Sequence, residues 1–364
     1  MEIKINFETL KKFWKNKKVF ITGHTGFKGT WICLMLNLLN SNIYGCSLKP
    51  LKKSLFNQTK INKYLKGNFF VDIRNIKILK KKLHDVKPEI IFHLAAQPLV
   101  TESFKDPVKT FDTNILGTVN LLECIRDLKS VKSVVIITTD KVYKIKKRNK
   151  MYSEIDELGG VDPYSSSKVG AEIVTASFIK SYFMKTNLKN RISTARAGNV
   201  IGGGDYSKNR LIPDIINSIN RKKKLTVRNP SHVRPWQHVI EPLLGYLLLA
   251  EKQYKGKIVN RNFSWNFGPA KIGFKTVKYV VNEIKKFHKI KFSIKKNDTI
   301  RETTILKLNS GKAKKYLNWS SLWNINRSLR QVIEWNYLSK KGYQIKTICE
   351  NQILMYLKET QSRK

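Results

Sequence analysis

Short apolar runs alternate with amphipathic segments over the first 200 residues of the chain. The runs are rich in Val, Ile and Phe and predict buried β-strands, whereas the amphipathic segments predict helices. We expect strands near residues 18–22, 43–47, 69–71, 89–94, 133–138 and 191–196, and helices at residues 28–39, 76–84, 108–127 and from 163 past 173. This alternation predicts an α/β fold with a doubly wound parallel sheet.

The regular alternation stops in the C-terminal part of the chain. A glycine-rich loop occupies residues 202–204, and later apolar runs such as residues 243–250 are not followed by regular strand and helix pairs. We therefore predict a first unit over residues 12–200, with a returning segment near residues 233–255. A smaller C-terminal unit is predicted over residues 201–360.

Composition favours a globular protein with an unusual charge. The chain has 364 residues, 41% of them hydrophobic, and its 70 Lys and Arg against 26 Asp and Glu give a net charge of +44. Such a charge is typical of proteins that bind nucleic acid or anionic membranes. Here the basic residues are spread over the whole chain together with many Asn and Ile, as in proteins from AT-rich genomes, so we expect no nucleic-acid partner.

The cysteines and the longest uncharged window exclude two further classes. Cys33, Cys46, Cys124 and Cys349 lie far apart without a C-x-x-C pair, so we expect no disulfide framework, no zinc site and no other metal site, and a reducing cytoplasm fits. The uncharged window at residues 30–48 is interrupted by Asn, Ser and Gly, and it predicts a helix followed by a strand. We therefore expect no membrane span.

Three glycines follow the first expected strand. Gly23, Gly26 and Gly29 are spaced G-x-x-G-x-x-G and open the first expected helix. Glycines in this position let backbone N–H groups approach a pyrophosphate at the helix N-terminus, as in a Rossmann domain, although a plain tight turn also favours glycine. The strand before and the helix after the glycines favour a dinucleotide site.

The adenosine end of such a site is less certain from the sequence. Asp72 follows the third expected strand, where its carboxylate could accept the adenine amino group or simply end the strand. The second strand usually ends in an acid that binds the ribose, but residues 44–49 contain no carboxylate. Lys49 would suit a 2′-phosphate, so this loop leaves the choice between NAD and NADP open.

Two groups of polar residues are candidates for acid–base chemistry. Tyr164 and Lys168 lie four apart and therefore on one helix face, where the cation would favour the phenolate; alternatively they are a surface pair. Thr139, Asp140 and Lys141 leave the carboxyl end of a buried strand, the edge at which ligands bind to parallel sheets. They offer a hydroxyl, an acid and a base, unless they form a solvated turn.

Together these motifs resemble the extended short-chain dehydrogenase/reductase family over roughly residues 15–335. The resemblance rests on TGHTGFKG at 22–29, HLAAQ at 93–97, Asn114 in NILGT, and YSSSK at 164–168. Within the family, the chain is most similar to the group that dehydrates CDP-glucose. The distinguishing motifs are DIR at 72–74, TDK at 139–141, where dTDP-glucose dehydratases carry TDE, and AGNVIGGGD at 197–205.

The resemblance implies a role for each matching residue. The implied catalytic residues are Thr139, Asp140, Lys141, Tyr164 and Lys168. The cofactor is implied to be NAD, bound by Tyr164 and Lys168 and by Gly23, Thr25, Gly26, Phe27, Gly29, Asp72, Ile73, Ala95, Ala96 and Asn114. The diphosphate of the nucleotide sugar is implied to bind Asn199, Arg210 and Arg234, and Asn266 is expected to line the same cleft.

The implied activity is that of a cytoplasmic lyase that converts CDP-D-glucose to CDP-4-keto-6-deoxy-D-glucose, a step toward the deoxysugars of bacterial lipopolysaccharide. Tyr164 would accept the proton of the C4 hydroxyl, and Asp140 and Lys141 would act in the elimination of water. The alternatives are another nucleotide-sugar 4,6-dehydratase, a 4-epimerase, or, more remotely, a nucleic-acid-binding protein with an inert Rossmann domain. We also expect a homo-oligomer.

Overall fold

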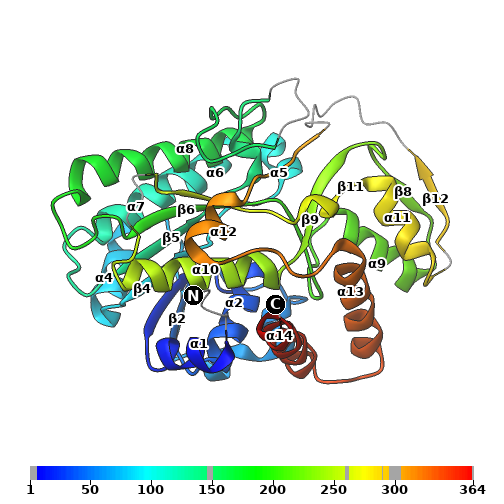
Figure 1. Ribbon diagram of the computed structural model, residues 1–364, viewed down its shortest axis with the longest axis horizontal. Coiled ribbons are helices and arrows are strands. Elements are labelled where there is room, and N and C mark those ends of the chain that lie inside the picture. The colour runs from blue at the N-terminus through cyan, green and yellow to red at the C-terminus, as the bar shows by residue number, and fades with distance from the viewer. Residues whose placement is uncertain (1–5, 146–150, 259–261, 289, 295–304, 363–364) are drawn as a thin grey trace.

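A seven-stranded parallel sheet forms the centre of the molecule (Figure 1). The computed structural model describes residues 6–145, 151–258, 262–288, 290–294 and 305–362. The strand order is β10-β6-β5-β4-β1-β2-β3, and all neighbouring pairs are parallel. The strands are β1 (Lys18–Thr22), β2 (Asn42–Ser47), β3 (Gly67–Phe70), β4 (Ile90–His93), β5 (Ser133–Ile137), β6 (Ile192–Ala197) and β10 (Ser264–Phe267). The predicted α/β fold is confirmed.

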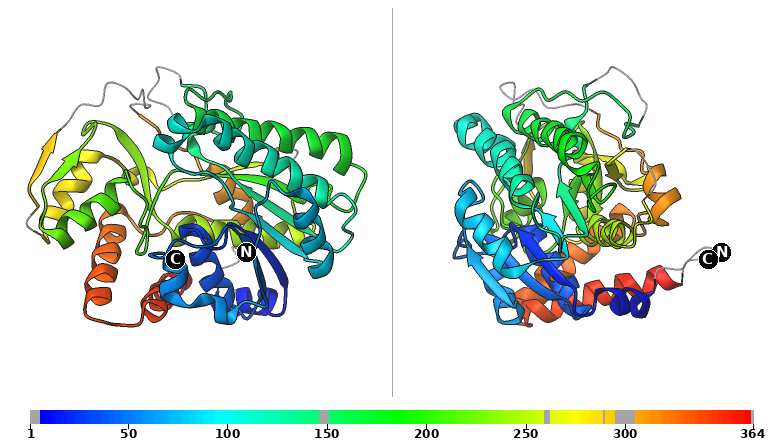
Figure 2. Two further views of the ribbon diagram at one scale, coloured as in Figure 1. Left: turned by 180° about the vertical axis from the view of Figure 1, so that it is seen from behind. Right: turned by 90° about the vertical axis from the view of Figure 1, so that its left-hand side faces the viewer.

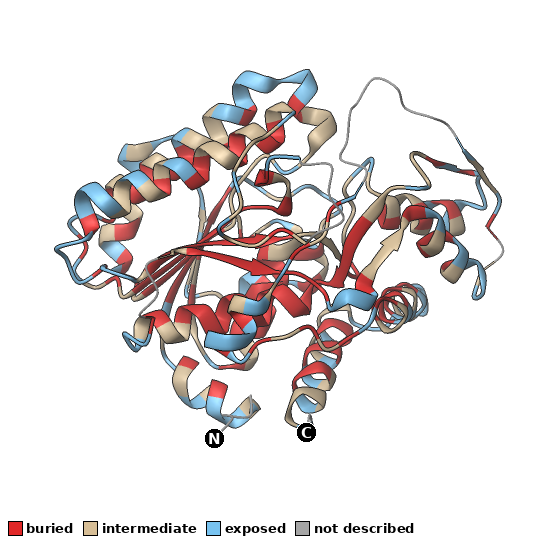
Figure 3. Cartoon of the chain, turned by 45° about the horizontal axis from the view of Figure 1, so that its top comes forward, coloured by how far each residue is buried: buried red, intermediate tan, exposed pale blue. Residues whose placement is uncertain are grey.

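The strands β1, β4 and β5 in the middle of the sheet are mainly apolar because both faces of the sheet are covered there (Figure 3). Successive side chains of a strand point to opposite faces, so Val19 and Ile21 enter one core and Phe20 enters the other. The first core contains α2 (Phe27–Leu38), α10 (Ile240–Tyr254), α12 (Gly311–Leu317) and α14 (Ile345–Gln361). The second contains α4 (Ile76–Val86) and α7 (Gly117–Cys124), and α8 (Pro163–Phe178) packs beside α7.

The chain reverses its direction of travel across the sheet at β1. From β1 it moves outward through β2 to β3, and it then returns to β4 on the other side of β1. The connections on the two sides cover opposite faces, which leaves a crevice above the carboxyl ends of β1 and β4. This is the place at which open α/β sheets bind ligands.

Two smaller sheets lie beyond the carboxyl edge of the large sheet, on the right of Figure 1. Their strands are β7 (Asn199–Ile201), β9 (Val233–His238) and β11 (Phe274–Thr276) in one sheet, and β8 (Leu225–Val227) and β12 (Phe292–Ile294) in the other. They share a separate apolar core with α9 (Leu211–Arg221), α11 (Val277–Lys285) and α13 (Ile325–Lys340).

The C-terminal part of the chain therefore contributes to both halves of the molecule. β10, α10, α12 and α14 pack with the large sheet, although they belong to the range 201–360 that the sequence assigns to the smaller unit. The division at residue 200 stays a prediction. Figure 2 shows α14 beside α1 (Phe7–Trp14), so that the two ends of the chain lie together.

Among the described residues, no helix has both the length and the apolar character needed to cross a bilayer. The helix expected at residues 108–127 is divided into α6 (Pro107–Phe111), the π-helical turn η2 (Asp112–Leu116) and α7. π-helical turns are rare and often mark functional sites, and this one contains Asn114.

Candidate active site

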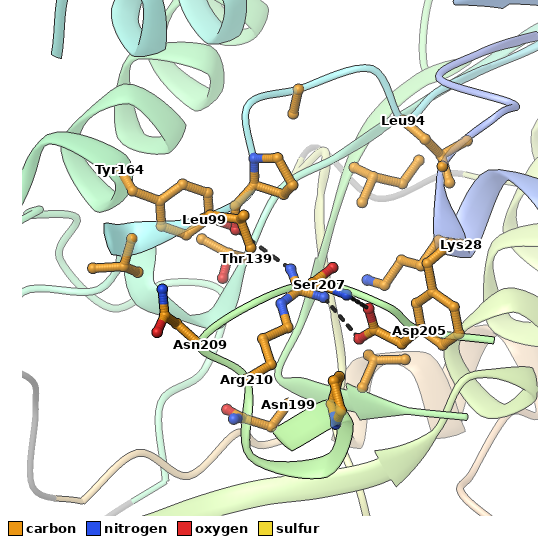
Figure 4. A pocket seen from close by; sticks show the side chains of 18 of the residues that line it. Lys28, Leu94, Leu99, Thr139, Tyr164, Asn199, Asp205, Ser207, Asn209 and Arg210 are labelled. Atoms are coloured by element: carbon orange, nitrogen blue, oxygen red, sulfur yellow. Dashed lines mark hydrogen bonds and ion pairs between the residues drawn. The ribbon is translucent and has the colours of Figure 1, made fainter. Parts of the chain in front are cut away.

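A single cleft of about 570 Å³ lies above the carboxyl ends of β1, β4, β5 and β6, and it extends between the two halves of the molecule. It brings together sixteen predicted site residues from segments far apart in the sequence: Gly23, Thr25, Gly26, Phe27, Gly29, Asp72, Ile73, Ala95, Ala96, Thr139, Lys141, Tyr164, Lys168, Asn199, Arg210 and Arg234. In Figure 4, Tyr164 and Thr139 lie on one side of the cleft and Lys28 and Asp205 on the other.

The glycine turn at the start of α2 is too tight for side chains. Gly23 has a φ of +75°, a conformation that favours glycine. A Cβ on Gly29 would lie 2.1 Å from the carbonyl oxygen of Gly23, whereas a Cβ on Gly26 would meet only that oxygen, at 3.3 Å. The turn thus exposes the N-terminal N–H groups of α2 to the cleft, and this arrangement fits a pyrophosphate.

The variant Gly29→Ala is expected to destabilise the protein by about 1–3 kcal/mol, because the backbone of the turn must move to admit the methyl group. The same movement should weaken binding of NAD, the dinucleotide that the motifs imply. Thermal unfolding and calorimetric titration with NAD would measure the two effects. Gly26→Ala is the matched control for stability, because its methyl group would need a shift of only a few tenths of an ångström from the Gly23 carbonyl oxygen. Equal losses of thermal stability in the two variants would contradict the tight turn.

The adenosine end of the cleft lacks an acid at the end of β2, as the sequence predicts. The hydroxyls of Thr25 and Ser47 lie 2.8 Å apart there, and Thr25 also donates to the carbonyl oxygen of Leu48. Asp72 lies on the adjoining wall, where its carboxylate pairs with Arg74 at 2.7 Å. Hydrogen bonds from Arg74 hold the pKa of Asp72 below its usual range. Binding of the adenine by Asp72 stays a prediction.

Asn114 is buried behind the cleft wall instead of lining it. Its side-chain oxygen accepts from the backbone N–H of Gln97 at 2.8 Å, and its amide donates to the carbonyl of Gln97 and to the hydroxyl of Ser167. Asn114 therefore fixes the loop after β4, which contains Ala95 and Ala96, against α8. Any effect on a dinucleotide would act through that loop.

Tyr164 and Lys168 lie on the first turns of α8, which begins with Pro163 and a capping box formed by Asp162 and Ser165. The Lys168 ammonium donates to the carbonyl oxygen of Ile137 at 3.2 Å. Burial lowers the pKa of Lys168 to about 8, although the Glu172 carboxylate opposes this shift.

The structure corrects one expectation about this pair. The sequence predicts that a cation lowers the pKa of Tyr164, but burial raises it above its usual value. The effects that lower the Tyr164 pKa come mainly from the charge of Lys141, a hydrogen bond with Thr139 and the charge of Arg210. The cations that favour the phenolate thus come from other segments of the cleft and not mainly from the same helix.

β5 ends at Ile137, and after Thr138 the chain continues with Thr139, Asp140 and Lys141. Asp140 starts the short 3-10 helix η3 (Asp140–Val142). One oxygen of the fully buried Asp140 carboxylate accepts from the Lys141 ammonium at 3.0 Å and from the Thr139 hydroxyl at 3.1 Å. The other oxygen has no partner among the described residues. It lies next to Gly198, where a Cβ would come within 3.0 Å of it. Asp140 itself is not among the residues that line the cleft.

The other half of the molecule contributes polar groups that suit an anionic ligand. Arg210 pairs with Asp205 at 3.2 Å and donates to the carbonyl of Pro98 across the cleft (Figure 4). Arg234 donates to the carbonyl of Val233 and lies 2.9 Å from the His232 ring. Arginine binds phosphate oxygens well because its guanidinium presents two parallel donors.

The sequence predicts that Asn266 lines the cleft, but the structure places it elsewhere. It is fully buried in β10, where its side-chain oxygen accepts from the Tyr143 hydroxyl and its amide donates to the carbonyls of Tyr152 and Asn309. These contacts use its hydrogen-bonding groups within the protein. Asn266 therefore supports the segment next to Lys141 from behind.

Lys28 is a cleft residue to which the sequence assigns no role. It lies in the glycine motif and points toward Asp205 in Figure 4. Desolvation, together with the nearby cations Arg210 and Lys168, lowers its pKa to about 7. Its place inside the motif GFKG was the available signal, but only the structure places it among other cations.

Comparisons with known proteins agree with this geometry. A family model described as GDP-mannose 4,6 dehydratase matches residues 20–332. The chain belongs to this family. It is also 38% identical to the CDP-glucose 4,6-dehydratase of Salmonella typhimurium, over 96% of this chain and 99% of that protein. The resemblance found in the motifs is thereby confirmed.

Solved structures of other nucleotide-sugar enzymes share the fold. The dTDP-glucose 4,6-dehydratase of Bacillus anthracis, in complex with NAD, gives a TM-score of 0.75 at 22% identity and covers 91% of this chain and 99% of its own. The UDP-glucose 4-epimerase of Thermotoga maritima, with UDP-glucose, gives a TM-score of 0.75 at 21% identity. The match covers 89% of this chain and 99% of the epimerase. These likenesses support the doubly wound sheet with its C-terminal additions.

Proposed function

We propose that the protein is a lyase that converts CDP-D-glucose to CDP-4-keto-6-deoxy-D-glucose and water with NAD as cofactor. The proposal rests chiefly on Lys141, which lines one cleft with Tyr164 and Lys168 and forms an ion pair with the fully buried Asp140. A 4-epimerase needs no additional acid and base beside Thr139. The 38% identity to the CDP-glucose 4,6-dehydratase of Salmonella typhimurium favours CDP-glucose over other nucleotide sugars.

The residues of the cleft fit a dinucleotide. The glycine turn leaves space for a pyrophosphate, and Asp72, Ile73 and the loop with Ala95 and Ala96 adjoin it. When bound, NAD would accept a hydride from the sugar and later return it, so the overall reaction would have no net redox change. Lys168, which donates to the carbonyl oxygen of Ile137, would orient the nicotinamide side of the site, while Lys141 and Arg210 would favour the Tyr164 phenolate.

The chain's own groups account for the proton transfers. Tyr164 accepts the proton of the C4 hydroxyl as C4 becomes a ketone, and the ketone acidifies the hydrogen at C5. Lys141, in its neutral form, accepts the C5 proton. Asp140, in its protonated form, gives a proton to the departing C6 hydroxyl, which leaves as water while a double bond forms between C5 and C6. For these roles the proton that the ion pair shares must lie on Asp140. Once the hydride is back at C6, the Lys141 ammonium would return the proton to C5.

Arg234→Ala is expected to raise the KM for CDP-glucose by about 10- to 100-fold while changing the affinity for NAD by less than about threefold, because the guanidinium is assigned to the substrate diphosphate. Steady-state kinetics and NAD titration would measure the two quantities. Arg221→Ala, at the end of α9 and outside the cleft, is the control. Equal losses for substrate and cofactor would contradict the placement of Arg234.

The proposed activity itself is tested with the purified protein, NAD and each of the common nucleotide glucoses in turn. Mass spectrometry should detect the loss of one water from CDP-glucose, with formation of a 4-keto sugar. Faster conversion of another nucleotide glucose would reassign the substrate. Interconversion of glucose and galactose without loss of water would identify an epimerase instead.

The proposal also includes a place in the cytoplasm, a role in making deoxysugars for bacterial lipopolysaccharide, and a homo-oligomeric state. Light scattering coupled to size-exclusion chromatography would determine the oligomeric state. The net charge of +44 remains the observation that favours the nucleic-acid alternative. Duplex binding with a steep dependence on salt, together with no binding of NAD or nucleotide sugar, would support that alternative.

A further inference from the structure

An ion pair with almost no exposure to solvent lies behind the catalytic segment. Arg196 of β6 binds the Glu172 carboxylate of α8 with two parallel hydrogen bonds of 2.9 and 2.8 Å, and the two side chains are 2% and 0% exposed. Burial opposes charge on Glu172, but Arg196 and neighbouring hydroxyls hold the pKa of Glu172 below its usual range. A buried ion pair is weak support for stability, because desolvation offsets much of its attraction. Its contacts indicate a different purpose.

The two partners hold opposite ends of the segment that carries the catalytic triplet. Glu172 accepts a hydrogen bond of 2.6 Å from the hydroxyl of Thr138, the residue directly before Thr139. Arg196 donates at 2.9 Å to the hydroxyl of Tyr143, which lies two residues after Lys141. The Tyr143 hydroxyl in turn donates to Asn266 in β10.

The same network fixes the segment relative to α8. Lys168 binds the carbonyl of Ile137, and Glu172, one helical turn later, binds the next residue, Thr138. Tyr164, Lys168 and Glu172 are spaced four apart and therefore share one face of α8. The helix that carries Tyr164 and the segment that carries Asp140 are thus held in a fixed register.

We propose that Glu172 and Arg196 are positioning residues, which hold Thr138 and Tyr143 and thereby fix the triplet Thr139–Asp140–Lys141 for the elimination step. Neither residue lines the cleft, so both act through the residues that they bind. The proposal rests on the proposed function, because that function assigns the elimination to the triplet. The short 3-10 turn of the triplet needs such support, because its own hydrogen bonds fix few of its dihedral angles.

Two buried threonines allow a matched test that leaves the ion pair intact. Thr138 and Thr194 each donate to a different oxygen of Glu172, at 2.6 and 2.7 Å, and both are buried. Thr138 adjoins the triplet, whereas Thr194 lies inside β6. Thr138→Val and Thr194→Val therefore each remove one hydrogen bond to Glu172, but only the first releases the triplet. Thr194 also bonds the Ser264 hydroxyl at 3.2 Å, and Thr138 itself lines the cleft, so Tyr143→Phe is needed as the second variant. Glu172→Gln is less suitable, because it leaves the Arg196 charge buried without its partner.

Thr138→Val is expected to lower kcat for CDP-glucose by about 10- to 100-fold with little change in KM, because a small displacement of reacting groups has effects of this size. Tyr143→Phe, which releases the other end and lies outside the main cleft, should do the same. Thr194→Val should keep kcat within about twofold of the wild type at a similar loss of thermal stability. A 4-keto hexose that retains its C6 oxygen should accumulate only in the first two variants.

Hydrogen exchange provides a readout that does not depend on activity. Amides of residues 139–143 should exchange faster in Thr138→Val and Tyr143→Phe than in Thr194→Val and the wild type. Near-normal kcat and exchange in the first two variants, or equal changes in Thr194→Val, would overturn the positioning role. If the wild-type protein did not dehydrate CDP-glucose, the proposed function would fail, and the exchange comparison alone would decide whether the ion pair holds the segment.

Discussion

Tyr164→Phe is expected to lower the turnover of CDP-glucose by about 10²- to 10⁴-fold, the usual contribution of a positioned general base. The substitution removes the proton acceptor and leaves the ring in place, so binding of NAD and substrate should change by less than about threefold. Burial raises the pKa of Tyr164. We therefore also expect the wild-type rate to increase with pH until the phenol has lost its proton, a loss that the nearby cations favour, and this limb should be absent in the variant.

The control for this experiment is Tyr206→Phe. Tyr206 is half-buried, donates its hydroxyl to Gln58, and is not among the residues that line the cleft. Its loss should leave turnover within about twofold of the wild type. Near-normal turnover in Tyr164→Phe would refute its assignment as the base that acts on the C4 hydroxyl.

Asp140→Asn is expected to stop the reaction after oxidation at C4, with a loss of overall turnover of about 10²-fold or more, because the amide is far too weak an acid to protonate the departing oxygen. A single-turnover mixture should then contain a 4-keto hexose that still carries its C6 hydroxyl. Mass spectrometry of the borohydride-reduced sugar would identify it. A variant that cannot oxidise C4 at all would move Asp140 from the elimination to the oxidation step.

Lys141→Met should also permit oxidation at C4, but it should slow the exchange of the C5 hydrogen with deuterated water by a similar factor of about 10². The methionine keeps the length of the side chain and removes the acceptor of the C5 proton. Lys144→Met is the control, because Lys144 forms an ion pair with Glu157 on the exposed side of the same segment. Unchanged exchange at C5 would exclude Lys141 as the base.

The regular part of the fold was predictable because its signals are local. The apolar runs at β1, β4 and β5 are uniform since side chains on both faces of these strands are buried. The glycine turn was recognisable for the same reason, since Cβ atoms on Gly26 and Gly29 would meet the backbone of residues 23 and 24, although one on Gly23 would meet the distant backbone of Ala95. Motifs of this kind are determined by short stretches of sequence.

Other features depend on contacts between distant segments. β10 was missed because four residues, Ser264–Phe267, become a sheet strand only by pairing with β6. Asn266 was assigned to the cleft because its type suits a ligand, but Tyr143, Tyr152 and Asn309 surround it in the structure. The expected direction of the Tyr164 pKa shift was wrong, because the effect of burial outweighs that of the nearby cations. No spacing in the sequence reveals how deeply the side chain is buried.

The late position of β10 in the sequence has a consequence for how the enzyme folds. Ser264 binds Arg196 at 2.9 Å, and Asn266 binds Tyr143, so a strand from the C-terminal part of the chain completes the support of the catalytic segment. During synthesis on the ribosome, β1 to β6 emerge well before β10, and contacts between distant parts of a chain form slowly. We therefore expect nascent chains that end before residue 262 to collapse around β1 to β5 while β6 remains an open sheet edge, a state that is prone to aggregate and depends on chaperones until β10 arrives.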